Sequence, residues 1–202
     1  MTLWRSDKPL LLASRSASRQ MLLREAGIPF EAVPADIDER GIQRDSKLTR
    51  PGEVAEMLAL EKALHVSDHF HLRWILGADQ TLSLDGKVFS KPAGRAGAFK
   101  QLKQLAGKTH ELHSALAIVR HDKPVWRSVT VARLTMRALT DAQIEKYLDE
   151  TGDKVTSSVG AYQLEGLGVH LFDKIEGDHF TILGLPLLPL LDFLRSQGLL
   201  AV

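Results

Sequence analysis

The stretch that decides the fold reads Leu10-Leu11-Leu12-Ala13-Ser14-Arg15-Ser16-Ala17-Ser18-Arg19. Its first four residues are apolar and predict a short strand, and residues 16–26 predict a helix that ends at Gly27. A strand that passes through a hydroxyl-rich turn into a helix leaves the first backbone N–H groups of that helix unpaired. With serine hydroxyls and an arginine beside them, such a turn can bind phosphate, although an ordinary helix cap with a solvated arginine explains it equally well.

Strand-like and helix-like patterns alternate on the C-terminal side of this turn. The sequence predicts strands at residues 30–33 and 74–78 and helices at residues 51–67 and 95–105. Asp85-Gly86 lies between two short strand patterns and is typical of a hairpin turn. This alternation indicates an early region in which helices connect the strands.

The second half of the chain is richer in strand patterns. Long strands are predicted at about 109–119 and 125–139, a capping box at Thr140 and Gln143 starts a helix, and residues 168–175 predict a strand. A final amphipathic helix begins near Leu187 and stops near Gly198. We therefore predict an α/β fold with a mixed, twisted β-sheet flanked by helices. We expect one domain over residues 1–202. An arrangement of this domain as two lobes around a central cleft is the alternative to a single compact unit.

Composition and charge narrow the classes of function. Of the 202 residues, 44% are hydrophobic and 25% are charged, and 26 basic against 25 acidic residues give a net charge of +1. This balance disfavours broad binding to nucleic acid or to a membrane surface. The absence of cysteine excludes disulfides, thiolate metal sites and cysteine nucleophiles. No apolar run reaches membrane-spanning length and the N-terminus is too polar for a signal peptide, so a cytoplasmic protein is expected.

Several charged side chains are candidates for chemistry. Asp79 follows the predicted strand 74–78, and a carboxylate there can hold a divalent cation or orient water, the alternative being a turn aspartate. Lys62 continues an apolar helix face with Val54 and Leu58, where a lysine usually extends its head group into solvent. Lys91 and the loop carboxylates Asp38 and Glu39 are unremarkable when each is taken singly.

Two tempting motifs do not support a site. His110-Glu111-Leu112-His113 has the look of a metal motif, but in a strand its two histidines face opposite sides of the sheet. Gly166-Leu167-Gly168 lacks the remainder of a dinucleotide fingerprint, and no Walker sequence or serine-hydrolase elbow occurs.

Taken together, the order of these pieces is distinctive. They are Leu12-Ala13-Ser14-x-Ser16-x-x-Arg19, Asp38-Glu39, Glu61-Lys62-Ala63, Gly77-Ala78-Asp79, Ser90-Lys91-Pro92, Gly160-Ala161-Tyr162 with Glu165-Gly166, and Gly184-Leu185-Pro186-Leu187. From residue 10 to about 195 the chain resembles the Maf family of nucleotide pyrophosphatases. The resemblance implies a mixed-sheet fold like that of inosine-triphosphate pyrophosphatases, a cytoplasmic and often dimeric protein, and a divalent cation, Mg²⁺ or Mn²⁺. It also implies a house-cleaning hydrolysis of nucleoside triphosphates, including modified ones, to the monophosphate and pyrophosphate.

The same resemblance assigns roles to individual residues. Asp79 matches a catalytic aspartate that activates water and contacts the metal, and Glu39 matches an acidic residue of the metal site. The polar and cationic groups that match those around the phosphates are Ser14, Arg19, Lys62 and Lys91. Glu165 stands where a branch acting on 7-methyl-GTP has glutamate, and where a branch acting on thymidine and uridine triphosphates has glutamine. A carboxylate suits the donor edge and the positive charge of a methylated guanine, although a turn-capping role explains Glu165 nearly as well.

The chain departs from the family pattern at four positions. Ala17 and Ser18 stand where Pro and Arg are common, Ser158 where many relatives carry lysine, and Gln80 where threonine is commoner. Two phosphate-side cations are therefore missing, and Arg15 or Arg24 is a candidate to compensate.

Three functions remain in competition. The leading hypothesis is a pyrophosphatase that favours 7-methyl-GTP-type substrates. The first alternative is a nucleotide-sensing regulator of septum formation without significant turnover, and the second is a phosphatase that acts on another phosphorylated metabolite. An acid suited to activating water favours turnover, and the near-neutral charge disfavours DNA binding.

Overall fold

In a computed structural model that describes residues 3–202, the chain folds around one seven-stranded sheet with the order β2-β1-β3-β5-β6-β7. The strands are β1 (Leu10–Leu12), β2 (Phe30–Ala32), β3 (Ile75–Leu84), β4 (Lys87–Phe89), β5 (Thr109–Arg120), β6 (Lys123–Met136) and β7 (Phe172–Glu176). β1 pairs in parallel with β2 and β3, the remaining pairs are antiparallel, and β4 pairs with β3 off the main path. The mixed α/β sheet that the sequence predicts is confirmed.

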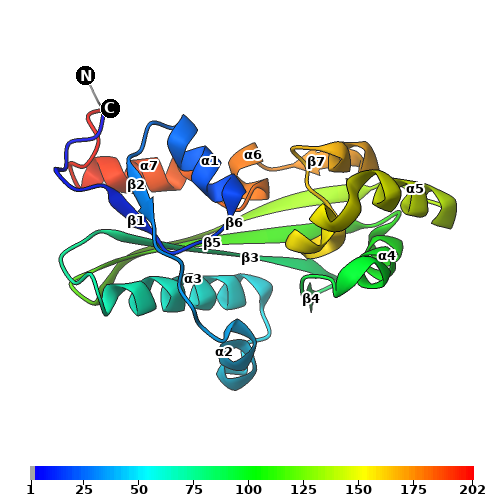
Figure 1. Ribbon diagram of the computed structural model, residues 1–202, viewed down its shortest axis with the longest axis horizontal. Helices are drawn as coiled ribbons and strands as arrows, with labels where there is room; N and C mark the ends of the chain where they lie inside the picture. The colour runs from blue at the N-terminus through cyan, green and yellow to red at the C-terminus, as the bar shows by residue number, and fades with distance from the viewer. Residues whose placement is uncertain (1–2) are drawn as a thin grey trace.

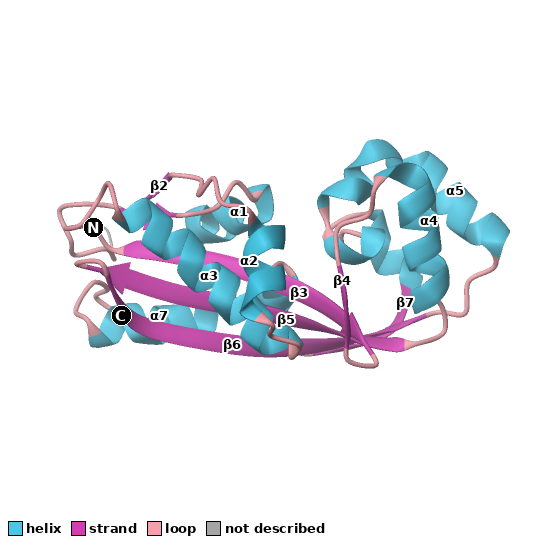
Figure 2. Cartoon of the chain, turned by 90° about the horizontal axis from the view of Figure 1, so that it is seen from below, coloured by secondary structure: helices cyan, strands magenta, loops and turns pink. Residues whose placement is uncertain are grey.

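Helices cover both faces of this sheet. The α-helices are α1 (Ala17–Glu25), α2 (Glu39–Ser46), α3 (Pro51–Ser67), α4 (Gly94–Leu105), α5 (Asp141–Thr151), α6 (His179–Ile182) and α7 (Leu187–Ser196). The 3₁₀ turns are η1 (Gly152–Ser157), η2 (Val159–Ala161) and η3 (Leu167–Leu171). α1 and α7 lie on one face and α3 on the other (Figure 1). Figure 2 shows α4 and α5 gathered at one end of the molecule, away from these helices, while β3, β5 and β6 run through both ends.

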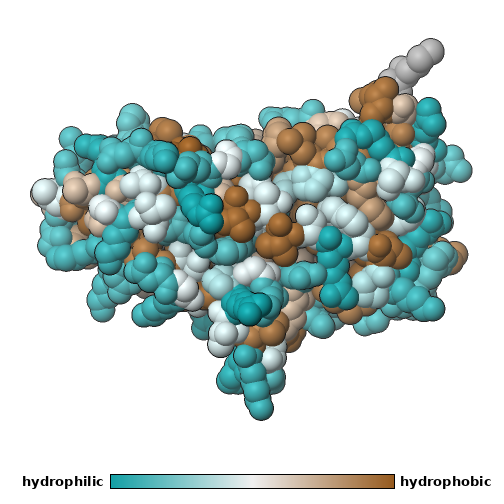
Figure 3. Space-filling model, turned by 180° about the vertical axis from the view of Figure 1, so that it is seen from behind, coloured by the Kyte–Doolittle hydropathy of each residue, from teal (hydrophilic) through white to brown (hydrophobic). Residues whose placement is uncertain are grey.

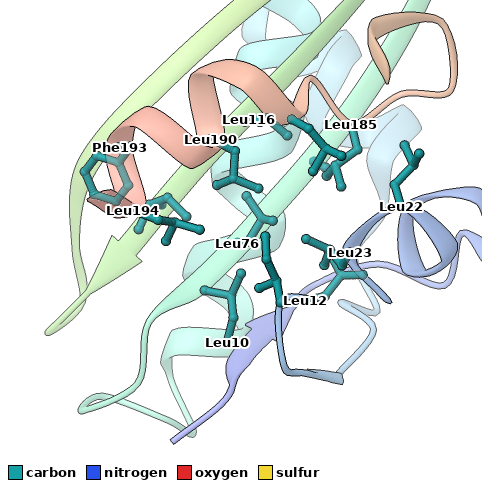
Figure 4. Packing of buried hydrophobic residues seen from close by; sticks show 14 of the residues in the cluster. Leu10, Leu12, Leu22, Leu23, Leu76, Leu116, Leu185, Leu190, Phe193 and Leu194 are labelled. Atoms are coloured by element: carbon teal, nitrogen blue, oxygen red, sulfur yellow. The ribbon is translucent and has the colours of Figure 1, made fainter. Parts of the chain in front are cut away.

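Two large hydrophobic clusters fill the two ends. The first packs α1 and α7 on the sheet around Leu12, Leu23, Leu76 and Leu190, which are buried (Figure 4). The second joins α4, α5 and the 3₁₀ turns around a set of buried side chains that includes Leu102, Leu112, Leu134, Ile144 and Tyr162. β5 contributes to both, since Leu116 belongs to the first cluster and Leu112 to the second. The description of residues 1–202 as a single domain stays a prediction.

The surface contrasts with these cores. On the face shown in Figure 3, hydrophilic side chains predominate and hydrophobic ones are scattered among them. None of the helices formed by residues 3–202 has both the length and the apolar character that crossing a membrane requires.

Most element predictions are confirmed because their signals are local. The Asp85-Gly86 turn joins β3 to β4 with positive φ at both residues, as a tight hairpin turn requires. The capping box at Thr140 and Gln143 is formed, and it starts α5.

Three predictions are wrong. The strand predicted at 74–78 continues to Leu84, because β5 pairs with it over that whole length, so Asp79 lies within β3 and not beyond its end. Glu39 is not in a loop but is the first residue of α2, whereas Asp38 is the last residue before that helix and caps it by accepting from the backbone N–H of Gly41. Residues 168–175 are not one strand, since η3 occupies the first part and β7 begins only at Phe172.

Candidate active site

A cleft of about 800 Å³ lies between the two ends of the molecule. Its walls include the turn before α1, the cleft side of α2, Lys62 on α3, the middle of β3, and the segment that follows β4. Residues of the 157–165 segment, which follows α5, close it from the other end. The residues that the family resemblance assigns to the site all line this cleft, namely Ser14, Arg19, Glu39, Lys62, Asp79, Lys91 and Glu165, whereas the candidate Asp38 is not among the lining residues.

The floor of the cleft exists because β3 loses a neighbour. β1 ends at Leu12, opposite Leu76, and β4 pairs with β3 only from Leu82 onward. Between these points β3 has a strand partner only on the β5 side. Asp79 lies in this open interval, which explains how a residue within a strand faces a cleft.

Gly77 brings α3 close to this part of β3. A Cβ atom at Gly77 would lie 1.9 Å from the backbone oxygen of Ala59, so no larger residue fits beneath the helix. The close approach places Lys62 against Asp79, with Nζ 2.5 Å from Oδ1. Lys62 therefore does not extend into bulk solvent; with 7% of its surface exposed, it points into the cleft floor.

Lys62 also joins two carboxylates from different elements. Its Nζ lies 2.8 Å from Oε1 of Glu39, the first residue of α2, and 2.5 Å from Oδ1 of Asp79 on β3. Burial raises the pKa of Asp79, and the nearby Lys62 and Arg19 charges oppose that rise. The floor of the cleft thus holds a carboxylate with a raised pKa, and the cations around it favour its ionised form.

Arg19 is the second buried cation of the site. Its Nη1 donates to the Ala78 backbone oxygen at 2.7 Å and to Ser14 Oγ at 3.2 Å, and its Nε donates to the Gly184 backbone oxygen at 2.9 Å. Burial lowers the pKa of Arg19, and the negative charges of Asp79 and Glu39 oppose this effect. Arg19 consequently joins the turn after β1, strand β3 and the loop before α7, and its charge lies near Asp79.

The turn before α1 has the form that the sequence predicts. Ser16 caps the helix by accepting from the Arg19 backbone N–H, and Ser14 Oγ accepts from the Ser16 backbone N–H. The first-turn residues Ala17 and Ser18 line the cleft. A helix start in this position presents backbone N–H groups and a partial positive charge to an anion.

Glu165 reaches this same turn from the other end of the molecule. The Ser18 hydroxyl donates to Glu165 Oε1 at 3.0 Å. Ser18, which stands where arginine is common in the family pattern, therefore has a structural role, because its hydroxyl links α1 to the 157–165 segment. A carboxylate thus lies in the cleft wall and is hydrogen-bonded to the start of α1.

The remaining cations separate into two groups. Lys91 and Arg15 line the cleft, and Nη2 of Arg15 lies 3.9 Å from Asp36 Oδ1. Arg24 lies instead over the Phe30 ring and is not among the lining residues, so it cannot replace a missing phosphate-side cation. Ser158 is in the wall of the cleft.

Gln80 has a role that its sequence position alone does not reveal. Its Nε2 lies within hydrogen-bond distance of Ser114 Oγ (2.8 Å) and of the backbone oxygens of Thr181 and Ile182 (both 3.0 Å). These bonds attach α6 to the sheet directly beside Asp79. A polar residue that follows a candidate catalytic aspartate is the only signal in the sequence that could have suggested it.

The prediction that His110 and His113 face opposite sides of the sheet is confirmed. His110 is buried in the second cluster with Nε2 2.7 Å from the Tyr162 hydroxyl, whereas His113 lies near Ser83 and Glu111. No group of three or more His, Asp or Glu side chains in residues 3–202 is arranged to hold a metal ion.

The cleft floor nevertheless fits a divalent cation that arrives with a phosphate ligand. Glu39 and Asp79 converge on one ammonium group, so their oxygens already share a position where a positive charge is stabilised. Mg²⁺ is typically bound through one or two carboxylates together with phosphate oxygens and water. Two carboxylates are therefore a sufficient protein contribution.

Comparisons with known proteins show the family of the chain. A family described as Maf-like protein matches residues 9–197. Nucleoside triphosphate pyrophosphatases of Rhodopseudomonas palustris CGA009 and Nitrobacter winogradskyi are 63% and 58% identical over 202 residues, with complete coverage of both chains. A 7-methyl-GTP pyrophosphatase of Rhizobium meliloti is 48% identical over 194 residues, which cover 95% of this chain and 98% of that one.

Solved structures give a weaker likeness. A HAM1 protein from Coxiella burnetii has 17% sequence identity and a TM-score of 0.45, with 65% of this chain and 74% of that chain covered. The sequence comparisons thus carry the family assignment.

Proposed function

The chain belongs to the Maf-like protein family and is a nucleoside triphosphate pyrophosphatase, a hydrolase, and from this premise we propose that Asp79 is its catalytic carboxylate. The observation that carries the proposal is the convergence of Asp79 and Glu39 on Lys62 at the floor of the cleft. The reaction splits a nucleoside triphosphate between the α and β phosphates into the monophosphate and pyrophosphate.

Asp79 acts as the base in this proposal. It takes a proton from the attacking water. The oxygen of this water forms a bond to the α-phosphorus as the bond between that phosphorus and the leaving pyrophosphate oxygen breaks. The raised pKa of Asp79 makes it a better proton acceptor than an ordinary carboxylate, and Lys62 and Arg19 favour its ionised form. Charge on the transferred phosphoryl group is stabilised by Lys62 and by the N–H groups at the start of α1.

Phosphate binding is assigned to the groups that surround this floor. Ser14 has its hydroxyl hydrogen free to donate, since its oxygen accepts from Ser16 and Arg19. Lys91 approaches from the segment that follows β4 and is exposed. A divalent cation, Mg²⁺ or Mn²⁺, held by Asp79 and Glu39 would neutralise charge on the triphosphate.

We further propose that the substrate is a 7-methyl-GTP-type nucleotide. Glu165 lies in the cleft wall and is positioned by Ser18, and a carboxylate there accepts from the N1–H and N2–H₂ donors of guanine. The positive charge of a methylated guanine adds to the attraction. The 48% identical relative that carries the name 7-methyl-GTP pyrophosphatase supports the same choice.

The first experiment tests the reaction itself. The purified protein is incubated with a panel of nucleoside triphosphates and Mg²⁺ or Mn²⁺, and pyrophosphate and orthophosphate are measured separately. Pyrophosphate with the monophosphate supports the proposal. Orthophosphate alone would identify a phosphatase, and binding without either product would identify a nucleotide sensor.

The second experiment tests the base. kcat/KM is compared for 7-methyl-GTP, GTP, UTP and dTTP with the wild type and with Glu165→Gln. Glu165 is exposed in the structure. When a bound base covers it, one mismatched polar contact corresponds to about tenfold discrimination or more, so the variant is expected to lose that preference. A wild type that prefers UTP or dTTP, or a preference that Glu165→Gln leaves unchanged, contradicts the assignment of Glu165. The homodimer and the cytoplasmic location stay predictions.

A further inference from the structure

Gln101 on α4 joins two segments of the cleft wall. Its Nε2 donates to the backbone oxygen of Ser90 at 2.6 Å, and its Oε1 accepts from the backbone N–H of Gly160 at 3.1 Å. Ser90 lines the cleft on the segment that follows β4, and Gly160 belongs to the 157–165 segment, which closes the cleft from the other end. One side chain thus connects two parts of the wall that are far apart in the sequence.

These two contacts use both ends of an amide. The Gly160 N–H can only donate and the Ser90 carbonyl can only accept, so Oε1 faces the first and Nε2 faces the second. A carboxylate at this position would lack the donor, and an ammonium group would lack the acceptor. The orientation of the Gln101 amide is therefore determined by its two partners.

Gly160 gives this connection a fixed end. Its φ is 82°, and a Cβ atom there would lie 2.6 Å from Cδ1 of Leu82 and 2.7 Å from Cε1 of Tyr162. Leu82 and Tyr162 are buried in the second hydrophobic cluster, and the Tyr162 hydroxyl lies 2.7 Å from Nε2 of His110. The backbone at Gly160 is thus packed against a close-packed core. Gln101 attaches its other partner, Ser90, to this fixed point.

The segment that Gln101 holds carries Lys91. Lys91 directly follows Ser90 and lines the cleft, and both residues are exposed, so their own burial does not hold them in place. β4 has already ended at Phe89, and α4, which begins at Gly94, has no side-chain cap. The lysine side chain is flexible, so the position of its backbone decides which region its ammonium group can reach. The hydrogen bond from Gln101 restrains that backbone one residue away.

We propose that Gln101 is a positioning residue for the hydrolysis: it places Lys91 for phosphate binding by tying Ser90 to Gly160. The proposal rests on the proposed function, which assigns Lys91 to phosphate. Gln101 contacts no reacting group and acts through the lysine. Its contribution to phosphate binding therefore exists only while Lys91 is present.

A double-variant cycle on the full-length protein tests this dependence, with inorganic pyrophosphate as the probe in calorimetric titrations. Lys91→Ala and Gln101→Met are each expected to weaken binding by about fivefold, the size of an exposed charge contact. The double variant should bind no more weakly than Lys91→Ala alone, because no lysine is left to be positioned. The matched control is Gln104→Met, which removes an exposed amide of the same helix that makes no side-chain hydrogen bond within residues 3–202. It should bind pyrophosphate as the wild type does.

A second variant, Gln101→Glu, separates positioning from stability. Its carboxylate keeps an acceptor for the Gly160 N–H but has no donor for Ser90. Pyrophosphate affinity is expected to fall as in Gln101→Met, while the melting temperature stays closer to that of the wild type. An affinity that follows the melting temperature across the two variants would make Gln101 a structural residue only.

Two results of the cycle would overturn the proposal. One is a pyrophosphate affinity that Gln101→Met leaves unchanged, and the other is a double variant in which the two single losses multiply in full. Either result leaves the proposed function standing. A wild type that forms no pyrophosphate from any nucleotide would instead defeat the proposed function, while the titrations still decide the role of Gln101.

Discussion

Two buried polar pairs lie on neighbouring strands of the sheet, and they differ in charge. Asp79 on β3 faces Lys62 at the floor of the cleft, with both side chains largely buried. His110 on β5 faces the Tyr162 hydroxyl inside the second hydrophobic cluster. The first pair is ionic and borders an open cleft, whereas the second is neutral and sealed.

The difference shows what each pair is for. Removing charges from water is unfavourable, so an ionic pair at 7% exposure adds little to stability and is best explained by chemistry. In the second pair, burial lowers the pKa of His110 to about 4, which keeps the imidazole uncharged near neutral pH. The hydrogen bond to Tyr162 satisfies Nε2 of His110 and the tyrosine hydroxyl within an apolar core, whereas Nδ1 of His110 is buried without a hydrogen-bond partner.

The sharpest separation of the two pairs is expected from Asp79→Asn. Loss of a general base typically lowers kcat by about 10²–10⁴-fold, and loss of a metal ligand adds to this. The free energy of unfolding is expected to stay the same or to rise, because the substitution removes a desolvated charge while Lys62 retains its ion pair with Glu39. Kinetic and urea-denaturation measurements check both expectations. The matched substitution Asp122→Asn, on the turn between β5 and β6, should leave kcat unchanged, and wild-type kcat in Asp79→Asn would contradict the site.

Lys62→Met tests the ionic pair from its other side. The variant leaves the Asp79 carboxylate buried without its nearest cation, which is expected to cost about 3–5 kcal/mol of unfolding free energy at neutral pH. The free Asp79 should then have a further raised pKa, so the loss should shrink as the pH falls and the carboxyl takes up a proton.

The double variant Lys62→Met/Asp79→Asn provides the control for this prediction. It should recover much of the lost stability but none of the activity, because the uncompensated charge is gone together with the base. Strictly additive losses in urea denaturation would show that the two side chains do not interact.

The neutral pair is expected to respond to acid. His110 titrates at about pH 4 in the folded protein and at about 6.5 when unfolded. Between these values the unfolded chain binds more protons, so stability falls as the pH is lowered from 6.5 to 4, by about 3 kcal/mol. The free energy of unfolding, measured by denaturation at several pH values in this range, should depend less on pH for His110→Gln than for wild type. The same pH dependence in both proteins would assign the acid sensitivity to other groups.

The smallest expected effect belongs to Lys91→Ala. Lys91 is exposed and makes no ion pair within residues 3–202, so its removal should leave the melting temperature unchanged. Activity towards triphosphates should fall by less than about tenfold, because an exposed charge contributes modestly. Lys87→Ala on β4 is the control, since Lys87 is outside the cleft lining. A lower melting temperature with unchanged kinetics would make Lys91 a structural residue.

Local signals in the sequence were enough to predict most of the helices and strands. The hydroxyl turn before α1, the Asp-Gly hairpin and the Thr140 capping box each depend on residues that are neighbours in the chain. α2 escaped prediction because its sequence, Glu39–Ser46, has few apolar residues and so lacks a periodic hydrophobic face. The end of β3 was misplaced because a strand extends as far as its partner strand does, and that partner comes some 30 residues later in the chain.

The sequence by itself determined the family order of motifs, and with it the residues proposed for the site. Only the tertiary structure decided how they act together: Gly77 lets α3 approach β3, so Lys62 meets Asp79, and the early end of β1 opens the floor where both lie. It also decided that Arg24 stays outside the cleft while Arg15 lines it. The physical reason is that side-chain identity and local turns are written in adjacent residues, whereas distances across the cleft depend on strand pairing and on the closeness of packed elements.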